Sequence, residues 1–349
     1  MKKQIHIAVL FGGRSAEHEV SLRSAQNVID ALDRKKYKVT LIGIDKRGRW
    51  LLGDTKPQIP TGGREIMSIS DSEATAGPID VVFPILHGPY GEDGTVQGLL
   101  KLAGIPFVGP SVLGSAVGMD KDVTKRLLRD AGIPIAKFVV LASGEKIATS
   151  KIIAELGLPL FVKPANLGSS VGVTKVERPR DLVVAIVDAL KYDRKVLVEE
   201  YVPGREIECS VLGNEQPSAS LPGEIIPHDT FYSYRAKYID ENGATLKIPA
   251  KLSAATTKKI QQLAVKTFKA LCCEGMARVD FFLRKNGEIV VNEINTIPGF
   301  TSISMYPKLW ETSGLSYGKL VDTLIELAIE RFKKEQKLLM EKPKVIGTM

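Results

Sequence analysis

The chain has 349 residues, of which 44% are hydrophobic and 25% are charged, as in a soluble globular protein of two or three domains. It contains no apolar run of about 18 residues, so no transmembrane helix is expected. The N-terminus lacks the apolar core of a signal peptide, and the three cysteines, two of them adjacent, form no disulfide framework. We therefore expect a cytoplasmic location.

The net charge of +8 is compatible with nucleic-acid binding. The basic residues are spread along the chain, however, without an arginine-rich arm or an alternation of aromatic and basic residues. Attraction of a small polyanion such as a nucleotide explains the sign of the charge equally well.

The N-terminal region predicts a buried parallel sheet, because its strands are continuous apolar runs. The predicted elements are a strand over residues 5–11, a helix over 20–32, strands over 37–45 and 81–86, a helix over 95–102 and a short strand at 107–108. Residues 54–78 are polar and rich in Gly, Pro and Ser, which predicts an irregular surface segment.

Ligands gather at the carboxyl ends of the strands in sheets of this kind. The sequence places Glu17 there, after Gly12-Gly13, together with a Gly-rich loop that begins at His87. A carboxylate in the first turn also stabilises a helix N-terminus, so Glu17 alone does not establish a binding site.

The middle of the chain alternates helices and strands. The predicted helices span residues 122–130, 151–156 and 180–190, and the predicted strands span 138–141, 160–163, 196–201 and 205–212. Lys121 starts the first of these helices, and Lys163 precedes a loop of Gly and Ser over residues 166–173. Backbone N–H groups of such a loop can surround phosphates, with the lysine as a point charge. It is not a Walker A loop, because the lysine precedes it and a strand follows it, and a mobile surface hairpin is the alternative.

Residues 275–300 carry the most specific pattern in the chain. Two predicted strands, over residues 277–283 and 289–295, flank Asn286-Gly287. This dipeptide favours a type I′ turn of two residues, because both positions of that turn need positive φ. The segment therefore predicts a tight β-hairpin.

Such a turn makes Asp280 face Glu293 and Arg278 face Asn295, with all four side chains on one face of the hairpin. Two carboxylates and an amide oxygen suit Mg²⁺, and Arg278 can bind a phosphate or a developing oxyanion. A solvated polar face is the alternative, and a longer turn would shift the register and separate the pairs.

The segment over residues 225–250 is low in regular pattern but rich in Tyr, Lys and Arg, which favours a functional loop such as a lid. A helix is predicted over residues 256–272, and a last amphipathic helix over 317–334, followed by a frayed tail. The expected core stripe of this last helix consists of Leu320, Leu324, Leu327 and Ala328.

Taken in this order, the Gly-Gly turn before Glu17, the lysine with its Gly/Ser loop and the acidic hairpin resemble the ATP-grasp enzymes, and among them the D-alanine–D-alanine ligase family. The likeness covers nearly the whole chain and rests on the segments FGGRSAEHEVSLRSA, HGPYGEDGTVQGLL, MDKDVTKRLLRDAGIP, FVKPANLGSSVGV, GREIECSVLG, ARVDFFL and NEINTIPGFTSISMYPKLW.

This resemblance implies an α/β chain, α+β in its ATP-binding part, with the ATP-grasp fold. The implied domains are an N-terminal Rossmann-like parallel-sheet domain over residues 1–119, a central ATP-grasp subdomain over 120–222, and a C-terminal subdomain over 223–349 that carries the lid loop and the metal site.

The resemblance also implies a role for each matching residue. The residues that match catalytic positions are Glu17, Ser169, Tyr238, Arg278 and the amide of Gly299. Those that match substrate-binding positions are His87, Lys237 and Ser304. Those that match ATP contacts are Lys121, Lys163, Ser170, Glu199, Val202 and Glu206. Those that match metal ligands are Asp280, Glu293 and Asn295.

The implied activity is the ATP-driven joining of two D-alanines through an acyl phosphate, with release of ADP and phosphate, for peptidoglycan precursor synthesis. The implied cofactors are ATP and two Mg²⁺ ions, or Mn²⁺ in their place. The implied partners are these small molecules and a second copy of the chain, without nucleic acid or membrane.

Four alternatives remain open at this point. They are a D-alanine–D-lactate ligase, a D-alanine–D-serine ligase, another ATP-grasp carboxylate ligase and a non-catalytic nucleotide-binding regulator. Tyr238 argues against the first of them, since the D-lactate enzymes have a histidine in this region.

Overall fold

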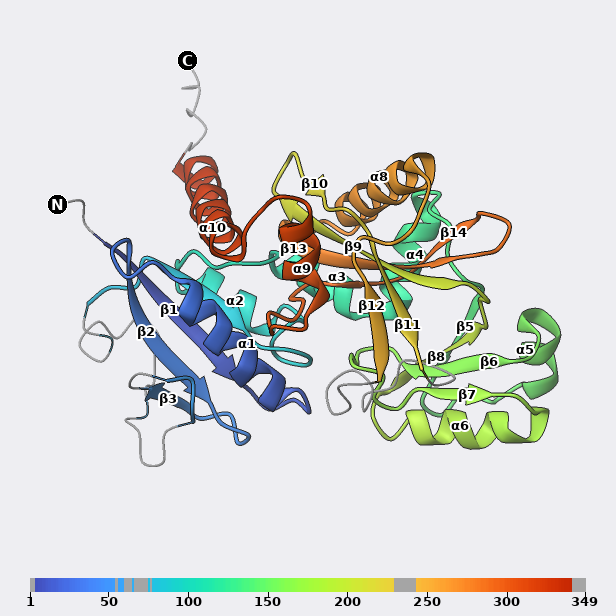
Figure 1. Ribbon diagram of the computed structural model, residues 1–349. Coiled ribbons are helices and arrows are strands. Elements are labelled where there is room, and N and C mark those ends of the chain that lie inside the picture. Colours follow the sequence, from blue (N-terminus) through green and yellow to red (C-terminus); the bar gives the residue numbers. More distant parts are fainter. Residues whose placement is uncertain are drawn as a thin grey trace, which may run out of the picture.

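Three β-sheets with helices packed against them make up the molecule (Figure 1). The structure, a computed structural model, describes residues 4–53, 56–59, 65, 75, 77–228 and 243–340. Among the helices in these residues, none has the length and apolar composition of a membrane span.

The first sheet is parallel at its centre, as its apolar strands predicted. Its strands are β1 (Ile5–Gly12), β2 (Tyr37–Ile44), β3 (Trp50–Gly53) and β4 (Val81–Ile85). Strand β1 pairs in parallel with β2 and β4, while β3 pairs antiparallel with β2 at the edge. Residues 7–11 of β1 are completely buried, because helices cover this sheet on both faces.

Three details of this region differ from the prediction. Strand β3 was not predicted, and the predicted strand at 107–108 is only a single bridge between Phe107 and Val82. A helix, α3 (Val112–Met119), was also not predicted, because glycine is a poor helix former. A side chain at Gly114 would meet the carbonyl oxygen of Cys272 at 2.6 Å, so glycine is required here for close packing.

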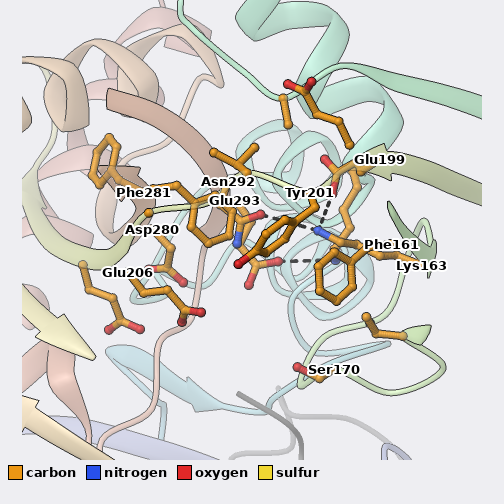
Figure 2. A pocket seen from close by; sticks show the side chains of 18 of the residues that line it. Phe161, Lys163, Ser170, Glu199, Tyr201, Glu206, Asp280, Phe281, Asn292 and Glu293 are labelled. Atoms are coloured by element: carbon orange, nitrogen blue, oxygen red, sulfur yellow. Dashed lines mark hydrogen bonds and ion pairs between the residues drawn. The ribbon is translucent and has the colours of Figure 1, made fainter. Parts of the chain in front are cut away.

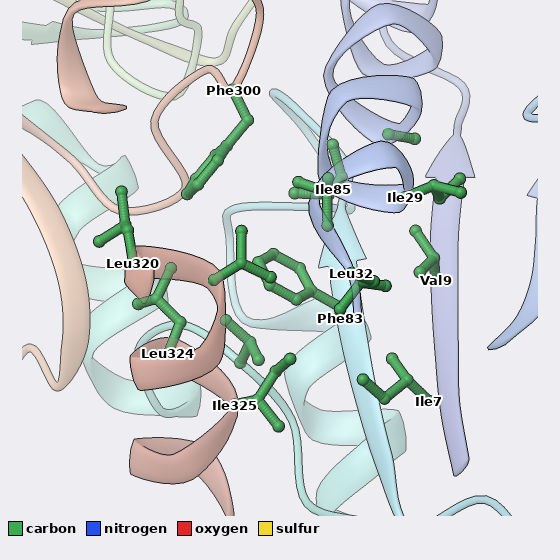
Figure 3. Packing of buried hydrophobic residues seen from close by; sticks show 14 of the residues in the cluster. Ile7, Val9, Ile29, Leu32, Phe83, Ile85, Phe300, Leu320, Leu324 and Ile325 are labelled. Carbon is green, nitrogen blue, oxygen red and sulfur yellow. The ribbon is translucent and has the colours of Figure 1, made fainter. Parts of the chain in front are cut away.

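The last helix packs against this first sheet as well as against strands that are closer to it in sequence. The helices around the sheet are α1 (His18–Ala31), α2 (Thr95–Leu102) and α10 (Tyr317–Met340). Figure 3 shows the shared core, with Ile7 and Val9 from β1, Phe83 and Ile85 from β4, Ile29 from α1, and Leu320, Leu324 and Ile325 from α10. The predicted apolar stripe of α10 is thus confirmed, although the helix extends beyond residue 334.

A second sheet, antiparallel throughout, has the strand order β5-β8-β6-β7. Its strands are β5 (Phe138–Ala142), β6 (Leu160–Pro164), β7 (Thr174–Val176) and β8 (Lys195–Glu200), and the helical elements of this part are α4 (Lys121–Asp130), α5 (Thr149–Leu156), η1 (Pro179–Asp181) and α6 (Leu182–Ala189). Every predicted helix and strand between residues 122 and 201 is present. The predicted loop of Gly and Ser connects β6 to β7.

The third sheet has the order β12-β11-β9-β13-β14, with β10 paired to β9. Its strands are β9 (Arg205–Gly213), β10 (Ser218–Ala219), β11 (Gly223–Pro227), β12 (Ala244–Lys247), β13 (Gly275–Leu283) and β14 (Ile289–Asn295), and its helices are α8 (Ala254–Ala270) and α9 (Met305–Thr312). The prediction of an irregular segment over 225–250 was wrong at both ends, where β11 and β12 pair with each other.

The turn of the β13–β14 hairpin is longer than the sequence suggested. The amide of Arg284 donates to the carbonyl of Glu288 at 2.9 Å, and the amide of Gly287 donates to that of Arg284 at 2.9 Å. Three residues therefore form the loop, and Gly287 is left-handed with φ 84°. This is the arrangement of a type I turn followed by a glycine bulge, so the predicted two-residue turn was wrong.

The predicted pairing survives because the hairpin contains a second irregularity. The register shifts between Asp280 and Phe281, which face Glu293 and Val291 respectively, so Asn292 is an extra residue in β14. This β-bulge cancels the shift that the longer turn introduces. Asp280 therefore faces Glu293, and Arg278 faces Asn295, as predicted.

The domain boundaries at residues 119/120 and 222/223 remain a proposal. The first boundary separates the first sheet from the second, whereas the other lies within the third sheet, since β9 and β10 precede it and pair with strands of that sheet. Helix α10 packs against both the first and the third sheet.

Arg331 ties α10 to the N-terminal region and gives a test of this packing. Its side chain is 6% exposed and donates to the carbonyls of Gly109 at 2.6 Å and Phe107 at 2.8 Å. We expect Arg331→Met to lower the free energy of unfolding by about 2–4 kcal/mol, because two buried carbonyls lose their donor. Urea unfolding measures the change.

Lys334→Met, one turn further along α10, is the matched control. Lys334 forms surface ion pairs with Glu215 and Glu330, which contribute little in water. We expect its unfolding midpoint to stay close to that of the wild type. Equal effects of the two substitutions would show that Arg331 does not anchor the helix.

Candidate active site

Three carboxylates lie side by side across the third sheet. Asp280 on β13 faces Glu208 on β9 and Glu293 on β14. All three line one pocket, and Figure 2 shows Asp280 and Glu293 among its lining side chains. We call these three residues the acidic row.

Arg278 compensates part of this charge. Its Nε lies 2.7 Å from Oδ1 of Asp280 and its Nη2 lies 2.8 Å from Oδ2, while Nε is also 2.9 Å from Oε2 of Glu208. Burial would lower the pKa of Arg278, but the carboxylates of Asp280 and Glu208 outweigh it and hold that pKa well above its usual value. Arg278 is therefore a permanent cation within the row.

Glu208 was missed by the sequence analysis. The available signal was strand alternation, because Glu206 and Glu208 are two residues apart on β9 and therefore share a face. Pairing between β9 and β13, which places Glu208 beside Asp280, is long-range and is not encoded in the local sequence.

The donor set suits a hard divalent cation. Asp280 and Glu293 supply carboxylates, and Asn295, whose Nδ2 donates to Oδ2 of Asp280 at 2.9 Å, supplies an amide oxygen. Among the described residues no group of three His, Cys, Asp or Glu side chains is arranged to hold a metal by itself. A cation here would need further oxygen ligands, which substrate phosphates commonly provide to Mg²⁺.

A second charged cluster, centred on Glu199, adjoins the acidic row. Figure 2 shows Lys163 between Glu199 and Asn292, the bulge residue of β14. Nζ of Lys163 lies 3.5 Å from Oδ1 of Asn292 and forms an ion pair with Oε2 of Glu199. Lys125, buried on α4, forms an ion pair with Oε1 of the same carboxylate.

Glu199 is ionised despite its burial. Desolvation would raise its pKa, but the ammonium groups of Lys125 and Lys163 outweigh this effect and lower the pKa to about 2. The sequence analysis named Glu199 and Lys163 but missed Lys125, because a lysine on a predicted helix is usually solvated.

Lys121 connects the Gly/Ser loop with the acidic row. Its Nζ donates to the carbonyl of Leu167 at 2.7 Å and lies 3.8 Å from Oε2 of Glu293. The loop itself turns sharply, because Ser169 and Ser170 have φ values of 55° and 59°. Consecutive positive φ values are costly for serine and are typical of functional sites.

Ser169 joins the central loop to the N-terminal region. Its hydroxyl donates to Oε1 of Glu17, a carboxylate that is 7% exposed. A side chain at Gly88 would meet Oε2 of Glu17 at 2.8 Å, so this glycine leaves room for the carboxylate. The structure therefore brings together two predicted site residues that are far apart in sequence.

His87 lies behind this pair rather than open to solvent. Its ring nitrogens lie 3.1 Å from the carbonyl oxygen of Ile297 and 3.1 Å from Oγ of Ser24. Burial lowers the pKa of His87, although Glu17 opposes the shift, so the imidazole is neutral near pH 7. These contacts join the loop after β4 to α1 and to the loop after β14.

Glu92 is a buried carboxyl in the same region that the sequence analysis did not single out. Its oxygens accept the amide hydrogens of Gly88 at 2.8 Å and Ile297 at 3.3 Å. Burial, reinforced by the charge of Glu17, raises the pKa of Glu92 to about 8. The group is therefore largely protonated at neutral pH.

The loop after β14 carries Gly299 and Ser304. A side chain at Gly299 would meet Oγ of Ser304 at 2.7 Å, so the two residues are in close contact. Oγ of Ser304 accepts the amide hydrogen of Thr301 at 3.0 Å, which fixes the position of its hydroxyl.

The remaining predicted nucleotide contacts line the same pocket as the acidic row. Ser170, Glu199, Val202 and Glu206 line it, together with the aromatic side chains of Phe161, Tyr201 and Phe282. Lys237 and Tyr238 fall outside the described residues.

Glu92 predicts a dependence of stability on pH. Its folded pKa is raised from 4.5 to about 8, so between about pH 5 and 8 the folded chain holds a proton that the unfolded chain has released. The free energy of unfolding then falls with rising pH by a few kcal/mol. Glu92→Gln should flatten this decline and be more stable than wild type at pH 8.5, as measured by urea unfolding.

Glu311→Gln, which removes an exposed carboxylate on α9, is the control and should retain the wild-type slope. If Glu92→Gln declines between pH 5.5 and 8.5 as steeply as the wild type, Glu92 does not titrate in this range.

Two sequence models of one family match the chain. The D-ala D-ala ligase N-terminus matches residues 6–110, and the D-ala D-ala ligase C-terminus matches residues 127–326. A curated relative, the D-alanine–D-alanine ligase of Oceanobacillus iheyensis, is 54% identical over 361 aligned positions that cover 97% of this chain and 98% of the relative.

Solved structures agree with these matches. The D-alanine–D-alanine ligase from Coxiella burnetii is 44% identical and superposes with a TM-score of 0.87 over 96% of this chain and 97% of its own. The VanG D-Ala:D-Ser ligase from Enterococcus faecalis is 39% identical, with a TM-score of 0.84 over 93% of this chain and 100% of its own. The fold is that of the ATP-grasp ligases, and the chain belongs to the D-alanine–D-alanine ligase family.

Proposed function

We propose that this protein joins two D-alanines into D-alanyl-D-alanine at the expense of ATP, as a step in peptidoglycan precursor synthesis. One observation carries the proposal. Lys121, Lys163 and the acidic row line one pocket with the Gly/Ser loop, and Ser169 of this loop forms a hydrogen bond with Glu17. Curated relatives that are named D-alanine–D-alanine ligase are about half identical to the chain over nearly its full length. The use of ATP also supports a cytoplasmic location.

The nucleotide end of the pocket is suited to bind ATP. The side chains of Phe161, Tyr201 and Val202 provide apolar surface for a base, and Glu206 would accept hydrogen bonds from the ribose hydroxyls. Lys121 and Lys163 provide cationic groups, and the loop amides near Ser170 provide further donors for phosphates.

Asp280, Glu293 and Asn295 would hold the divalent cations, two Mg²⁺ ions in our proposal, with Mn²⁺ able to replace them. The metal supplies charge neutralisation for the transferred phosphate. The protein's own contribution is to fix the acidic row on rigid strands beside the lysines.

The substrate end is suited to two amino acids. We propose that Glu17, oriented by Ser169, binds the ammonium group of the first D-alanine, with His87 positioning the surrounding chain. Arg278 and the amide of Gly299 would stabilise the oxyanion that forms when the second amine attacks the acyl phosphate.

The hydroxyl of Ser304 would bind the carboxylate of the second substrate. Lys237 and Tyr238, which lie outside the described residues, are proposed to complete the site from the lid segment. A closed lid would exclude water, to which an acyl phosphate is labile.

A ligase that uses D-serine as its second substrate is the competing proposal, because a D-Ala:D-Ser ligase superposes on the chain almost as well as the D-alanine enzyme. Phosphate release from ATP should be measured with D-alanine alone and with D-alanine plus D-serine or D-lactate, with mass analysis of the product. We expect D-alanyl-D-alanine as the main product. A predominance of the mixed product would assign the other activity.

A homodimer is proposed from the family resemblance alone. Light scattering of the purified chain at several concentrations distinguishes a dimer from a monomer.

Removal of a metal ligand should abolish turnover. We expect Asp280→Asn and Glu293→Gln each to lower kcat by at least about a thousandfold, because the phosphate charge would lose its neutralisation. Glu288→Gln, an exposed position on the turn of the same hairpin, is the control and should retain activity. Near-normal turnover in either ligand variant would refute the metal assignment.

Ser169 and Ser170 provide a matched pair, since both have positive φ and alanine is equally strained at either position. We expect Ser169→Ala to lower kcat/KM for D-alanine about 10- to 100-fold, because Glu17 loses its donor. Ser170→Ala should instead raise the KM for ATP. Steady-state kinetics in both substrates separates these outcomes, and identical effects would contradict the two assigned roles.

A further inference from the structure

The carboxylate of Asp280 is already occupied by protein donors. Arg278 donates to both of its oxygens, and Asn295 donates to Oδ2. A divalent cation at this position would compete with the guanidinium of Arg278 for the same oxygen atoms. Because Oδ2 already accepts two hydrogen bonds, a cation that binds through this atom displaces one of its donors.

Among the described residues, Glu208 is the other carboxylate that forms an ion pair with Arg278. Its Oε2 lies 2.9 Å from Nε, the same nitrogen that donates to Oδ1 of Asp280 at 2.7 Å. Glu208 is 6% exposed and is fixed on the central strand β9. The guanidinium is thus shared between two carboxylates on neighbouring strands.

We infer that Glu208 is a positioning residue that holds Arg278 when Asp280 turns to the metal. Only 17% of the Arg278 side chain is exposed, and a largely buried guanidinium without a carboxylate partner is unfavourable. A small shift toward Glu208 keeps it paired and frees oxygens of Asp280. The inference rests on the proposed metal site and assigns to Glu208 a role in metal affinity that acts through Arg278.

The position of Glu208 explains why it is not simply another ligand. It lies on the far side of Asp280 from Glu293, and its Oε2 and Oδ1 of Asp280 are both within 2.9 Å of Nε of Arg278. Substitution by glutamine keeps the shape of the side chain but removes the charge that competes for Arg278. The guanidinium would then stay on Asp280.

Binding of Mn²⁺ at saturating ADP, followed by electron paramagnetic resonance, measures this effect without turnover. We expect Glu208→Gln to raise the dissociation constant for Mn²⁺ at least fivefold, and Glu208→Asp, which keeps the charge, to stay within about threefold of wild type. Glu288→Gln removes an exposed carboxylate from the turn of the β13–β14 hairpin and should change the constant less than twofold. Thermal unfolding checks that each variant is folded.

The Arg278→Gln background separates the inferred role from a general loss of negative charge. In this background there is no guanidinium that Glu208 could hold away from Asp280. The double variant Glu208→Gln/Arg278→Gln should therefore bind Mn²⁺ within twofold of Arg278→Gln alone. Because it removes both members of the ion pair, this comparison also holds if Glu208→Gln alone folds poorly.

Two results would overturn the inference. One is wild-type Mn²⁺ affinity in Glu208→Gln, and the other is a fivefold or greater loss in the double variant relative to Arg278→Gln. Asp280→Asn distinguishes these results from failure of the proposed function. If Asp280→Asn weakens Mn²⁺ binding but Glu208→Gln does not, only the role inferred for Glu208 is refuted. If Asp280→Asn does not weaken Mn²⁺ binding, the proposed metal site is refuted as well.

Discussion

The structure depends on the balance between carboxylates and cations at the centre of the third sheet. Facing side chains on neighbouring strands lie about 4.5–5.5 Å apart, and like charges at that distance repel. Glu208, Asp280 and Glu293 occupy such positions. Arg278 and Lys121 supply the compensating charges, so the sheet can form while it keeps a concentration of oxygen ligands that a purely structural sheet would avoid.

The same principle extends to the lysine cluster and the loop beside it. Glu199 holds Lys163 and Lys125 together in the interior, and a buried ion pair of this kind is poor evidence for stability, because desolvation offsets most of its attraction. A role in phosphate binding explains this buried cluster better than a contribution to stability does. Lys163 is held beside Asn292 and the acidic row, where a phosphate would need it, and the cost of this preorganisation is met during folding rather than on binding.

Local sequence patterns predicted most helices and strands, the parallel sheet and the facing pairs of the hairpin. They failed where distant segments decide the outcome. The pairing of Asp280 with Glu293 was predicted from a turn that is one residue too short. The pairing is nevertheless present, because a bulge at Asn292 offsets the extra turn residue. Glu208 and Lys125 were missed because their importance arises from burial against other elements, which alternation or helix periodicity does not reveal. Only the family resemblance assigned Ser169 and Glu17 to one site, since no local rule joins residues so far apart.

The central claim is that the acidic row and its lysines bind the metal and the phosphates of the nucleotide. A crystal structure of the protein with ADP and Mn²⁺, with anomalous diffraction to locate the manganese, tests it most directly. We predict an anomalous peak in contact with Asp280, Glu293 and Asn295, with the ADP phosphates between it and Lys163. A manganese peak elsewhere, or ADP bound away from this pocket, would contradict the account.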